Sequence, residues 1–358
     1  MRVMHYYPRA LVGDGGITNA VRKLSQGMVN AGAQVVVAHD TGVAPPGRTE
    51  VEWVPVRHRG RTGLRVPIGL ERALAGADVL VLHSAWTLHN ARAAAVARKL
   101  GVAYVPMPRG AYDPSIVARR RLRKKLWWVA LERKLLHRSL AVHLFFAEER
   151  AHLERLGYRG PVIVAPNGVE PPEGVSWDGG RGGYVLWMGR FDPDHKGLDL
   201  LLGGLALLPE GRRPQLRLHG PDWRGRKSDV VAMVSEMGLG RWVTIGEPIH
   251  GETKWRTLAG ALGFVYPSRW EGFGNSVAEA VSIGLPTLST PYPLGVYLAA
   301  RGGALVTEAT PAGLASGLER LLDDDAPEIG RRGAKVVREE ISWDAVARSW
   351  IEQAAALL

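Results

Sequence analysis

The sequence predicts an α/β protein built from two Rossmann-like domains, each with a doubly wound parallel sheet. Short apolar runs, such as residues 78–83 and 262–266, are typical of buried parallel strands. Segments with apolar residues at helical spacing alternate with these runs, which is the pattern of βαβ units. Residues 171–183 are rich in Gly and Pro and lack periodicity, so they are expected to link two domains. A chain of 358 residues is long enough for both.

The first domain is expected to span residues 1–168. Its first strand leads into a turn with Gly15 and Gly16, followed by a helix that ends at Gly32. Taken alone, this turn is either a tight connection without a ligand or a phosphate-binding turn, because the full dinucleotide-binding pattern is missing. Another strand ends at His83, on the sheet edge where ligands bind, and this His is either structural or part of a site. Strands are expected at residues 2–7, 35–38, 78–83, 102–107, 141–146 and 162–165.

The second domain is expected to span residues 169–342, and residues 343–358 are expected to form a terminal helix. Asn275 is a favourable N-cap for a helix that ends at Gly284. Two helical segments are expected between residues 311 and 340. Strands are expected at residues 184–188, 215–219, 243–246, 262–266, 285–289 and 304–307.

Two carboxylates flank the turn that follows residues 262–266. Glu271 precedes the predicted helix and Glu279 lies about one turn inside it, so both can face the crevice at the sheet edge. Carboxylates near a helix N-terminus are electrostatically favourable even without a ligand. An ionised carboxylate only accepts hydrogen bonds, and vicinal sugar hydroxyls are donors that fit such a pair.

The composition restricts the kinds of partner and compartment. The net charge of +11 indicates an acidic partner, which is nucleotide phosphate, an anionic membrane face, an acidic acceptor or nucleic acid. The chain has no cysteine, which excludes disulfides and thiolate metal sites and fits a reducing compartment. Neither a signal-peptide pattern nor a membrane-spanning apolar run is present, so a cytoplasmic protein is expected.

Residues 119–138, from Arg119 to Arg138, form the most basic segment of the chain. A helix is expected because one partial apolar face is formed by Leu122, Leu126, Val129 and Ala130. This face either packs into the core of an ordinary solvated helix or, with two neighbouring Trp residues, lies on an anionic membrane at its inner surface. A nucleic-acid footprint is the third interpretation, and the less favoured one.

Several motifs together resemble the retaining family-4 glycosyltransferases of the GT-B fold. Glu271-Gly-Phe-Gly with Glu279 eight residues on and Gly284-Leu-Pro is similar to their E-x7-E segment. Residues 166–169 resemble their PNGV signature, and residues 189–199 resemble their GR…KG-x-D element. The resemblance covers essentially the whole chain. It implies two Rossmann-like domains facing one cleft, with the acceptor bound by the first domain, the donor by the second, and the terminal helix crossing back to the first.

The resemblance also implies roles for single residues. Arg190 and Lys196 are expected at the donor diphosphate, Glu271 at the donor sugar and Glu279 at the nucleotide ribose. Many members carry a His where this chain has Arg109, so Arg109 is expected to pair with phosphate or to position the acceptor. The expected catalytic residues are Arg190, Lys196, Glu271 and Arg109. The other donor-binding candidates are Gly15, Gly16, Gly189, Gly220, Pro248, Gly272, Phe273, Gly274, Asn275 and Ser276, and the acceptor-binding candidates are His83 and Asp113.

The resemblance predicts a retaining glycosyltransferase that moves a sugar from a nucleoside-diphosphate sugar to an acceptor hydroxyl in glycan, glycolipid or glycoconjugate biosynthesis. The alternatives are a glycosyltransferase acting on modified DNA or a natural product, a GT-B epimerase or phosphorylase, and a sugar-nucleotide-binding protein without activity. No cofactor or metal is expected. Asp192 and Asp194 mimic the D-x-D metal motif of another glycosyltransferase fold, but they lie inside the loop that carries Arg190 and Lys196.

Overall fold

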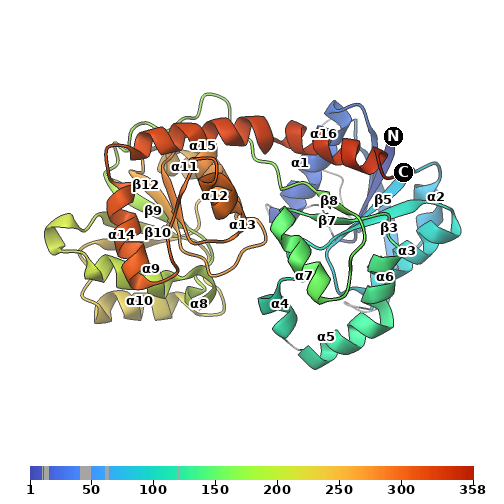
Figure 1. Cartoon of the computed structure of the whole chain (residues 1–358), viewed down its shortest axis with the longest axis horizontal. Helices are drawn as coiled ribbons and strands as arrows, with labels where there is room; N and C mark the ends of the chain where they lie inside the picture. Colours follow the sequence, from blue (N-terminus) through green and yellow to red (C-terminus); the bar gives the residue numbers. More distant parts are fainter. Residues whose placement is uncertain (10, 12–15, 41–49, 61–63, 120) are drawn as a thin grey trace. The chain divides into compact units, whose positions relative to one another are not determined.

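The computed structural model describes residues 1–358 except residues 10, 12–15, 41–49, 61–63 and 120 (Figure 1). The described chain divides into two compact units. The first comprises Met1–Gly168 together with Ile341–Leu358, and the second comprises Val169–Glu340. Within the described residues, none of the helices has the length and apolar character needed to span a bilayer.

The first unit is built on a mostly parallel sheet. Its strands are β1 (Arg2–Tyr7), β2 (Gln34–Asp40), β3 (Glu52–Arg59), β4 (Val66–Ile68), β5 (Val79–His83) and β6 (Ala103–Met107). They lie in the order β4-β3-β2-β1-β5-β6, and β3 and β4 pair antiparallel while the other neighbours are parallel. The interior strand β5 is buried along its whole length, as expected for a parallel strand covered on both faces. Strands β3 and β4 were not predicted from the sequence.

Helices connect these strands, and a short second sheet follows. Strand β7 (Val142–Leu144) pairs parallel with β8 (Val162–Val164). The helical elements are α1 (Gly16–Asn30), α2 (Leu70–Leu74), α3 (Leu88–Lys99), α4 (Pro114–Ala118), α5 (Arg121–Trp127), the π-helix η1 (Trp128–Glu132), α6 (Arg133–His137), the 3₁₀ turn η2 (Ala147–Glu149), α7 (Arg150–Arg155) and α16 (Trp343–Ala355).

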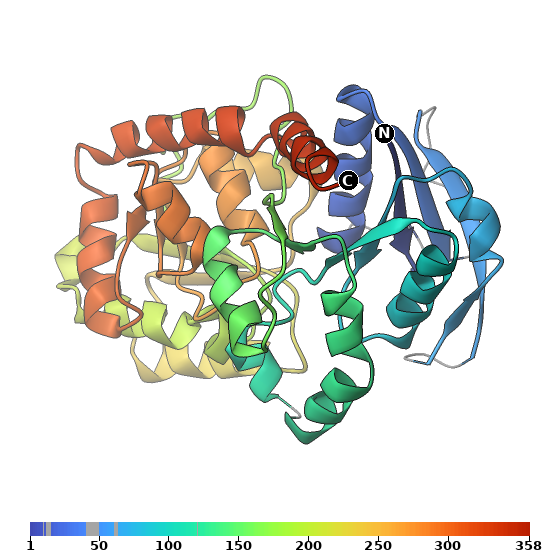
Figure 2. The same cartoon turned by 45° about the vertical axis from the view of Figure 1, so that its right-hand side comes forward.

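The C-terminal helix α16 packs against α1 (Figure 2). Glycines make this close approach possible, since a Cβ on Gly27 would lie 2.8 Å from the carbonyl oxygen of Trp343. A Cβ on Gly168 would collide with the Trp343 side chain. Asn30 donates a hydrogen bond of 3.0 Å to Asp344 across the two helices. These contacts explain why the last residues of the chain belong to the first unit.

The second unit is built on a parallel sheet of order β11-β10-β9-β12-β13-β14. Its strands are β9 (Tyr184–Met188), β10 (Gln215–His219), β11 (Val243–Gly246), β12 (Gly263–Tyr266), β13 (Thr287–Ser289) and β14 (Leu305–Val306). The strands β10 and β11 lie on one side of β9, and β12, β13 and β14 lie on the other. The order of connection therefore reverses between β9 and β12, which are neighbours in the sheet.

The helical elements of the second unit are α8 (Pro193–Lys196), α9 (Leu198–Leu207), the 3₁₀ turn η3 (Glu210–Arg212), α10 (Lys227–Glu236), α11 (Gly251–Ala259), α12 (Asn275–Ser282), α13 (Pro293–Ala299), α14 (Pro311–Leu321) and α15 (Ala326–Glu340). The predicted N-cap of α12 was wrong by one residue. Gly274 is the N-cap, with a φ of 94°, and Asn275 is the first helical residue. A positive φ is readily available to glycine, so the backbone requirement outweighs the capping preference of Asn.

The basic segment is helical but is not one regular helix. It runs from α5 through the π turn η1 into α6. The apolar stripe, defined as Leu122, Leu126 and Val129, stays on the surface with exposed fractions of 81%, 74% and 64%. The interpretation in which this stripe packs into the core is therefore wrong.

Candidate active site

The carboxyl edge of the second sheet brings together most of the predicted donor residues. Gly189 and Arg190 follow β9, and residues 267–274 follow β12. Because the connections leave these two neighbouring strands in opposite directions, a crevice is expected at their ends. Helix α12 begins directly after the second of these loops, and its N-terminal turn favours negatively charged ligands.

Lys196 and Glu271 form a charged pair at this edge. Lys196 is only 6% exposed, and its Nζ donates hydrogen bonds to Glu271 Oε1 and, at 2.9 Å, to the hydroxyl of Tyr266. Ser268 Oγ donates to the same Glu271 oxygen at 2.7 Å. The carboxylate is therefore held in a fixed position by two loops that the sequence separates widely.

Gly197 lets these two loops touch. Its φ is +63°, and a Cβ at this position would collide with the carbonyl oxygen of Pro267. Lys196 precedes this glycine, and the loop after β12 begins at Pro267. The close backbone approach places the ammonium group of one loop beside the carboxylate of the other.

Tyr266 interacts with both predicted cations. Burial, followed by the negative charge of Glu271, raises the pKa of Tyr266 well above its ordinary value, whereas the positive charge of Arg190 acts in the opposite direction. The guanidinium of Arg190 stacks over the ring of Trp223, with Cζ 4.2 Å from the ring centroid. Arg190 and Lys196 therefore act on the same buried phenol, and the phenol stays protonated as a hydrogen-bonding group.

His195 is a further residue at this edge that the sequence did not indicate. Its ring stacks on Trp270 with centroids 4.4 Å apart and planes at 4°. Nε2 lies 2.9 Å from the Trp270 carbonyl oxygen, which can only accept, so Nε2 carries the proton. Burial and then the charge of Lys196 lower the pKa of His195, which keeps the ring neutral.

Glu279 projects from α12 and pairs with a cation from another helix. Lys254 Nζ, on α11, lies 2.8 Å from Glu279 Oε1, and both side chains are about a quarter exposed, at 22% and 24%. Lys254 was not among the predicted site residues, because a lysine inside a helix carries no motif. The pair leaves Glu279 within reach of solvent and of a ligand at the sheet edge.

The remaining donor candidates line the same edge or the start of α12. Gly220 follows β10, and a Cβ there would collide with the carbonyl oxygen of Gly189, so the two loops cross backbone against backbone. Pro248 lies in the loop after β11 and is half-buried. The residues from Gly272 to Ser276 form the entry to α12, where Phe273 is buried at 5% exposure, Gly272 and Ser276 are half-buried and Asn275 is exposed.

Arg109, in the first unit, lies among neutral partners. Its guanidinium donates to Asn167 Oδ1 at 3.2 Å and to His83 Nδ1 at 3.3 Å. Among the described residues no carboxylate forms an ion pair with Arg109, and burial lowers its pKa to about 10. An arginine is a pure donor, so His83 Nδ1 accepts and its proton sits on Nε2, which lies 3.0 Å from His5 Nδ1.

The other candidates of the first unit differ in how far they form a site. Asp113 caps helix α4, since its Oδ1 accepts from the backbone N–H of Ser115 at 2.8 Å and from the Ser115 hydroxyl. Gly16 is the exposed first residue of α1. Gly15 lies outside the described residues.

Asp192 and Asp194 are engaged by other groups. Asp192 caps α8, with the backbone N–H of His195 as donor at 3.4 Å. Arg226 Nη1 lies 2.5 Å from Asp194 Oδ2 and 3.5 Å from Asp192 Oδ1. In the part of the chain that the structure describes, there is no cluster of three or more metal-ligating side chains.

Two family models match the chain. The one described as "Glycosyl transferase 4-like domain" matches residues 15–168, and the one described as "Glycosyl transferases group 1" matches residues 182–324. The chain is 30% identical over 170 residues to O-antigen chain mannosyltransferase B of Escherichia coli. That match spans 45% of this chain and 43% of the relative, which is less than half of its length.

Solved structures share the fold across the whole chain. Sucrose-phosphate synthase from Thermosynechococcus elongatus has a TM-score of 0.77 at 19% identity, and the match covers 100% of this chain and 99% of that one. HepE from Anabaena, in complex with UDP and glucose, has a TM-score of 0.74 at 14% identity, covering 99% of each chain. The two parallel-sheet units thus define a protein of the GT-B class. The chain belongs to the group 1, family-4-like glycosyltransferases.

Proposed function

We propose that this protein transfers a sugar from a nucleoside-diphosphate sugar to an acceptor hydroxyl in the synthesis of a glycan, a glycolipid or another glycoconjugate. The observation that carries the proposal is the arrangement of Arg190, Lys196 and Glu271 around Tyr266 at the switch between β9 and β12. The similarity to a mannosyltransferase and to a fold solved with UDP and glucose supports this class of substrate.

The cations at the carboxyl edge of the second sheet suit a reaction in which a nucleoside diphosphate is the leaving group. Negative charge grows on the phosphate oxygens as the sugar–oxygen bond breaks, and fixed cations stabilise it. Arg190, stacked on Trp223, offers a bidentate guanidinium, and Lys196 offers a nearby point charge. We assign the diphosphate to these two residues and to the N-terminal turn of α12.

The two glutamates take the hydroxyl groups of the donor. Glu271, positioned by Lys196 and Ser268, accepts hydrogen bonds from the sugar, and Glu279 accepts them from the ribose. We propose retention at the anomeric carbon through a front-face mechanism, in which the leaving phosphate takes the acceptor's proton. The protein then contributes position and charge, and the cations make a divalent metal unnecessary.

We assign binding of the acceptor to the first unit. Arg109 is a buried cation surrounded by neutral groups, which favours an approaching anionic or strongly polar group. The exposed apolar stripe of α5 and η1 and the surrounding basic residues support peripheral binding to an anionic membrane, on its inner face.

The proposal is tested by a thermal-shift screen of sugar nucleotides, because a ligand that binds the native state raises the melting temperature. The stabilising donor is then incubated with candidate acceptors, and the anomeric configuration of the product is read by NMR. A stabilising donor and a product with the donor's configuration are expected. Inversion would refute retention, and donor binding without turnover on any acceptor would indicate a binding protein.

A further inference from the structure

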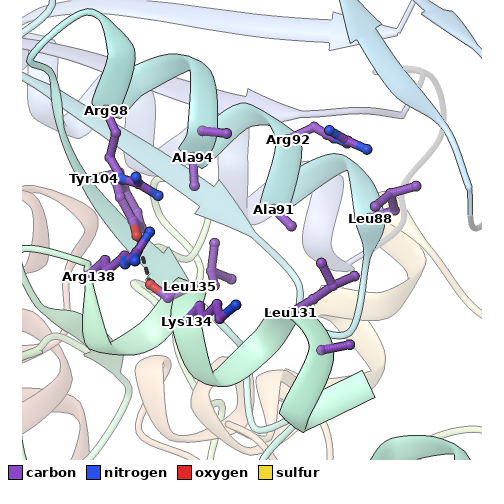
Figure 3. A pocket seen from close by; sticks show the side chains of 12 residues that line it. Leu88, Ala91, Arg92, Ala94, Arg98, Tyr104, Leu131, Lys134, Leu135 and Arg138 are labelled. Carbon is purple, nitrogen blue, oxygen red and sulfur yellow. Dashed lines mark hydrogen bonds between the residues drawn. The ribbon is translucent and has the colours of Figure 1, made fainter. Parts of the chain in front are cut away.

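A groove lies between α3 and the helical segment η1–α6 of the first unit (Figure 3). Its volume is about 270 Å³. Much of its lining is apolar, with Leu88 and Ala94 from α3 and Leu131 and Leu135 from the facing segment. The small alanines of α3 leave the space open. Tyr104 closes one end, where its hydroxyl donates a hydrogen bond of 2.9 Å to the Leu135 carbonyl oxygen.

The polar side chains around this α3–α6 groove are mostly cations. Arg92 and Arg98 project from α3, and Lys134 and Arg138 come from the facing segment. All four are exposed, and none forms an ion pair or a hydrogen bond with another described residue. The lining contains no carboxylate. Four uncompensated cations beside an apolar floor form a surface that complements an anion with a hydrophobic tail.

The same helical run carries the apolar stripe. Val129 precedes the groove residues Ala130 and Leu131 directly in η1. Leu122, Leu126 and Val129 expose most of their surface, and Arg123 and Lys125 of the same helix are also exposed. Exposed leucines flanked by cations are typical of a helix lying at a membrane interface. The groove therefore continues a surface that is suited to anionic lipid.

We propose that the α3–α6 groove binds one anionic phospholipid of the membrane, with a segment of an acyl chain on the apolar floor and the phosphate among the four cations. This inference deepens the membrane role in the proposed function and rests on it. The groove is smaller than the roughly 300 Å³ at which pockets for drug-sized ligands begin. It therefore holds part of one chain rather than a whole bulky ligand.

The chemistry of the lining disfavours other occupants. A sugar needs hydrogen-bond acceptors as well as donors, and this groove offers cations beside aliphatic carbon. A nucleic-acid backbone would use the cations but would leave the apolar floor uncovered. An anionic lipid satisfies both parts of the surface at once.

The experiment uses a short-chain, monomeric phosphatidylglycerol with a photoreactive group on one acyl chain, followed by peptide mapping of the cross-linked protein. Cross-links are expected on peptides from α3 and from η1–α6. Ala95→Trp fills the groove at constant charge and should abolish them, while Ala312→Trp, on an exposed position of α14, should not. Removing two groove cations in Lys134→Ser/Arg138→Ser should weaken binding about 25-fold, at about fivefold for each cation.

The charge control is Lys335→Ser/Arg338→Ser, which removes two exposed cations from α15 of the second unit. Circular dichroism confirms that each variant is folded. Cross-links elsewhere, insensitivity to Ala95→Trp, or equal weakening in both charge variants would overturn the inference. A groove variant that loses duplex-DNA binding in a mobility-shift assay but keeps its lipid cross-links would overturn it in favour of nucleic acid.

Separate measurements keep this inference distinct from the proposed function. Stabilisation by sugar nucleotides tests donor binding without any lipid. Flotation with phosphatidylglycerol and with phosphatidylcholine vesicles tests membrane adsorption, and Leu122→Ser/Leu126→Ser should reduce it without affecting the cross-links of the monomeric lipid. Adsorption that survives Ala95→Trp together with lost cross-links would show that the membrane role and the groove are separate.

Discussion

Glu271 and Lys196 meet with little access to solvent, since their side chains are 12% and 7% exposed. Removing one partner of such a pair leaves an uncompensated charge and typically costs about 3–5 kcal/mol of stability. A loss of activity in Glu271→Ala would therefore combine the effect of lower stability with the effect of a lost contact to the substrate. Glu271→Gln keeps the shape and an oxygen acceptor for Lys196. It therefore disturbs the fold less than Glu271→Ala, and the thermal unfolding of the variant separates a loss of stability from a loss of chemistry.

We expect Glu271→Gln to lower kcat by about 10- to 100-fold, as for a lost charge-assisted hydrogen bond to the reacting sugar. The dissociation constant of the free nucleoside diphosphate should change much less, because that ligand lacks the sugar. Steady-state kinetics and calorimetry measure the two quantities. Glu252→Gln, exposed on α11, is the matched control. A tenfold loss of nucleotide affinity in Glu271→Gln would mean that the two glutamates are assigned the wrong way round.

Glu279→Ala is expected to weaken binding of the free nucleoside diphosphate by about 1–3 kcal/mol, because the ribose loses a charged acceptor. The substitution also releases Lys254, because Glu279 is the only carboxylate that pairs with it among the described residues. Lys254→Ala therefore completes a double-mutant cycle that separates the ribose contact from the ion pair. Unchanged affinity in Glu279→Ala would remove this residue from the ribose role.

At the scale of elements, the packing of α16 on α1 depends on glycine. Ala is the better helix former, so Gly27→Ala would stabilise an isolated α1. In the protein the added methyl group would lie 2.8 Å from a backbone oxygen of Trp343, which cannot move aside as a flexible side chain does. Overpacking of this kind costs about 1–3 kcal/mol, so the clash is expected to outweigh the gain in propensity.

We therefore expect Gly27→Ala to lower the free energy of unfolding and to speed amide exchange in α16. Hydrogen exchange with peptide resolution measures both effects. Gly240→Ala is the matched control, because a Cβ there has no atom within 4 Å. A Gly27→Ala protein with unchanged exchange in α16 would show that the helix docks without needing this glycine.

The elements that the sequence predicted well are those with buried apolar runs. The runs at β5 and β12 were found because parallel strands are apolar on both faces. Strand β3 was missed because its sequence, EWVPVRHR, is charged and contains a proline, and the exposure pattern of β3 shows that much of it faces solvent. The N-cap at Gly274 was missed because residue type does not reveal a positive φ.

The motifs of the site were visible in the sequence, but their pairing was not. Glu271 and Lys196 lie 75 residues apart and meet only because β9 and β12 are neighbours. Lys254 belongs to no motif, and its place at the edge follows from tertiary packing alone. His195 lies at a variable position of the GR…KG-x-D element, so the motif gave it no role, and its stacking on Trp270 depends on tertiary packing. The sequence of the chain indicates which side chains are functional, whereas the partners that hold those side chains in place depend on the order of the strands in the sheet.

At the scale of the whole molecule, we expect the activity to be independent of divalent metal ions, because cationic side chains lie where a metal would otherwise bind. Arg190 and Lys196 supply cations at the proposed diphosphate site, while Asp192 and Asp194 are engaged by Arg226. We therefore expect full transferase activity in EDTA. Activity assays after chelation, with and without added Mg²⁺ or Mn²⁺, measure this. Complete loss in EDTA with recovery on adding either ion would instead assign Asp192 and Asp194 to a metal.

The two units should respond differently to acid, because the first contains several buried neutral histidines. Burial and then the charge of Arg109 lower the pKa of His5 and of His143 to about 3, from an ordinary value of 6.5. His83 is shifted in the same direction. Between about pH 6.5 and pH 3 the unfolded chain takes up protons that the folded unit does not, so stability falls as the pH falls. Each histidine contributes up to about 1.4 kcal/mol per pH unit in that window.

Glu149 acts in the opposite direction over part of this range. Burial raises its pKa to about 7 from 4.5, so its contribution to stability is present at low pH and is lost as the pH rises toward 7. The pKa of the buried Glu132 is raised like that of Glu149. Five histidines of the first unit have lowered pKa values, so they outweigh the two carboxyl groups, and the net effect below pH 6.5 is destabilisation of that unit. The five are His5, His83, His89, His143 and His152. We expect peptide-resolved hydrogen exchange, corrected for intrinsic rates, to show earlier loss of protection in that unit on acidification. His143→Phe should make its pH dependence shallower, and equal acid sensitivity in both units would contradict the assignment of neutral buried histidines.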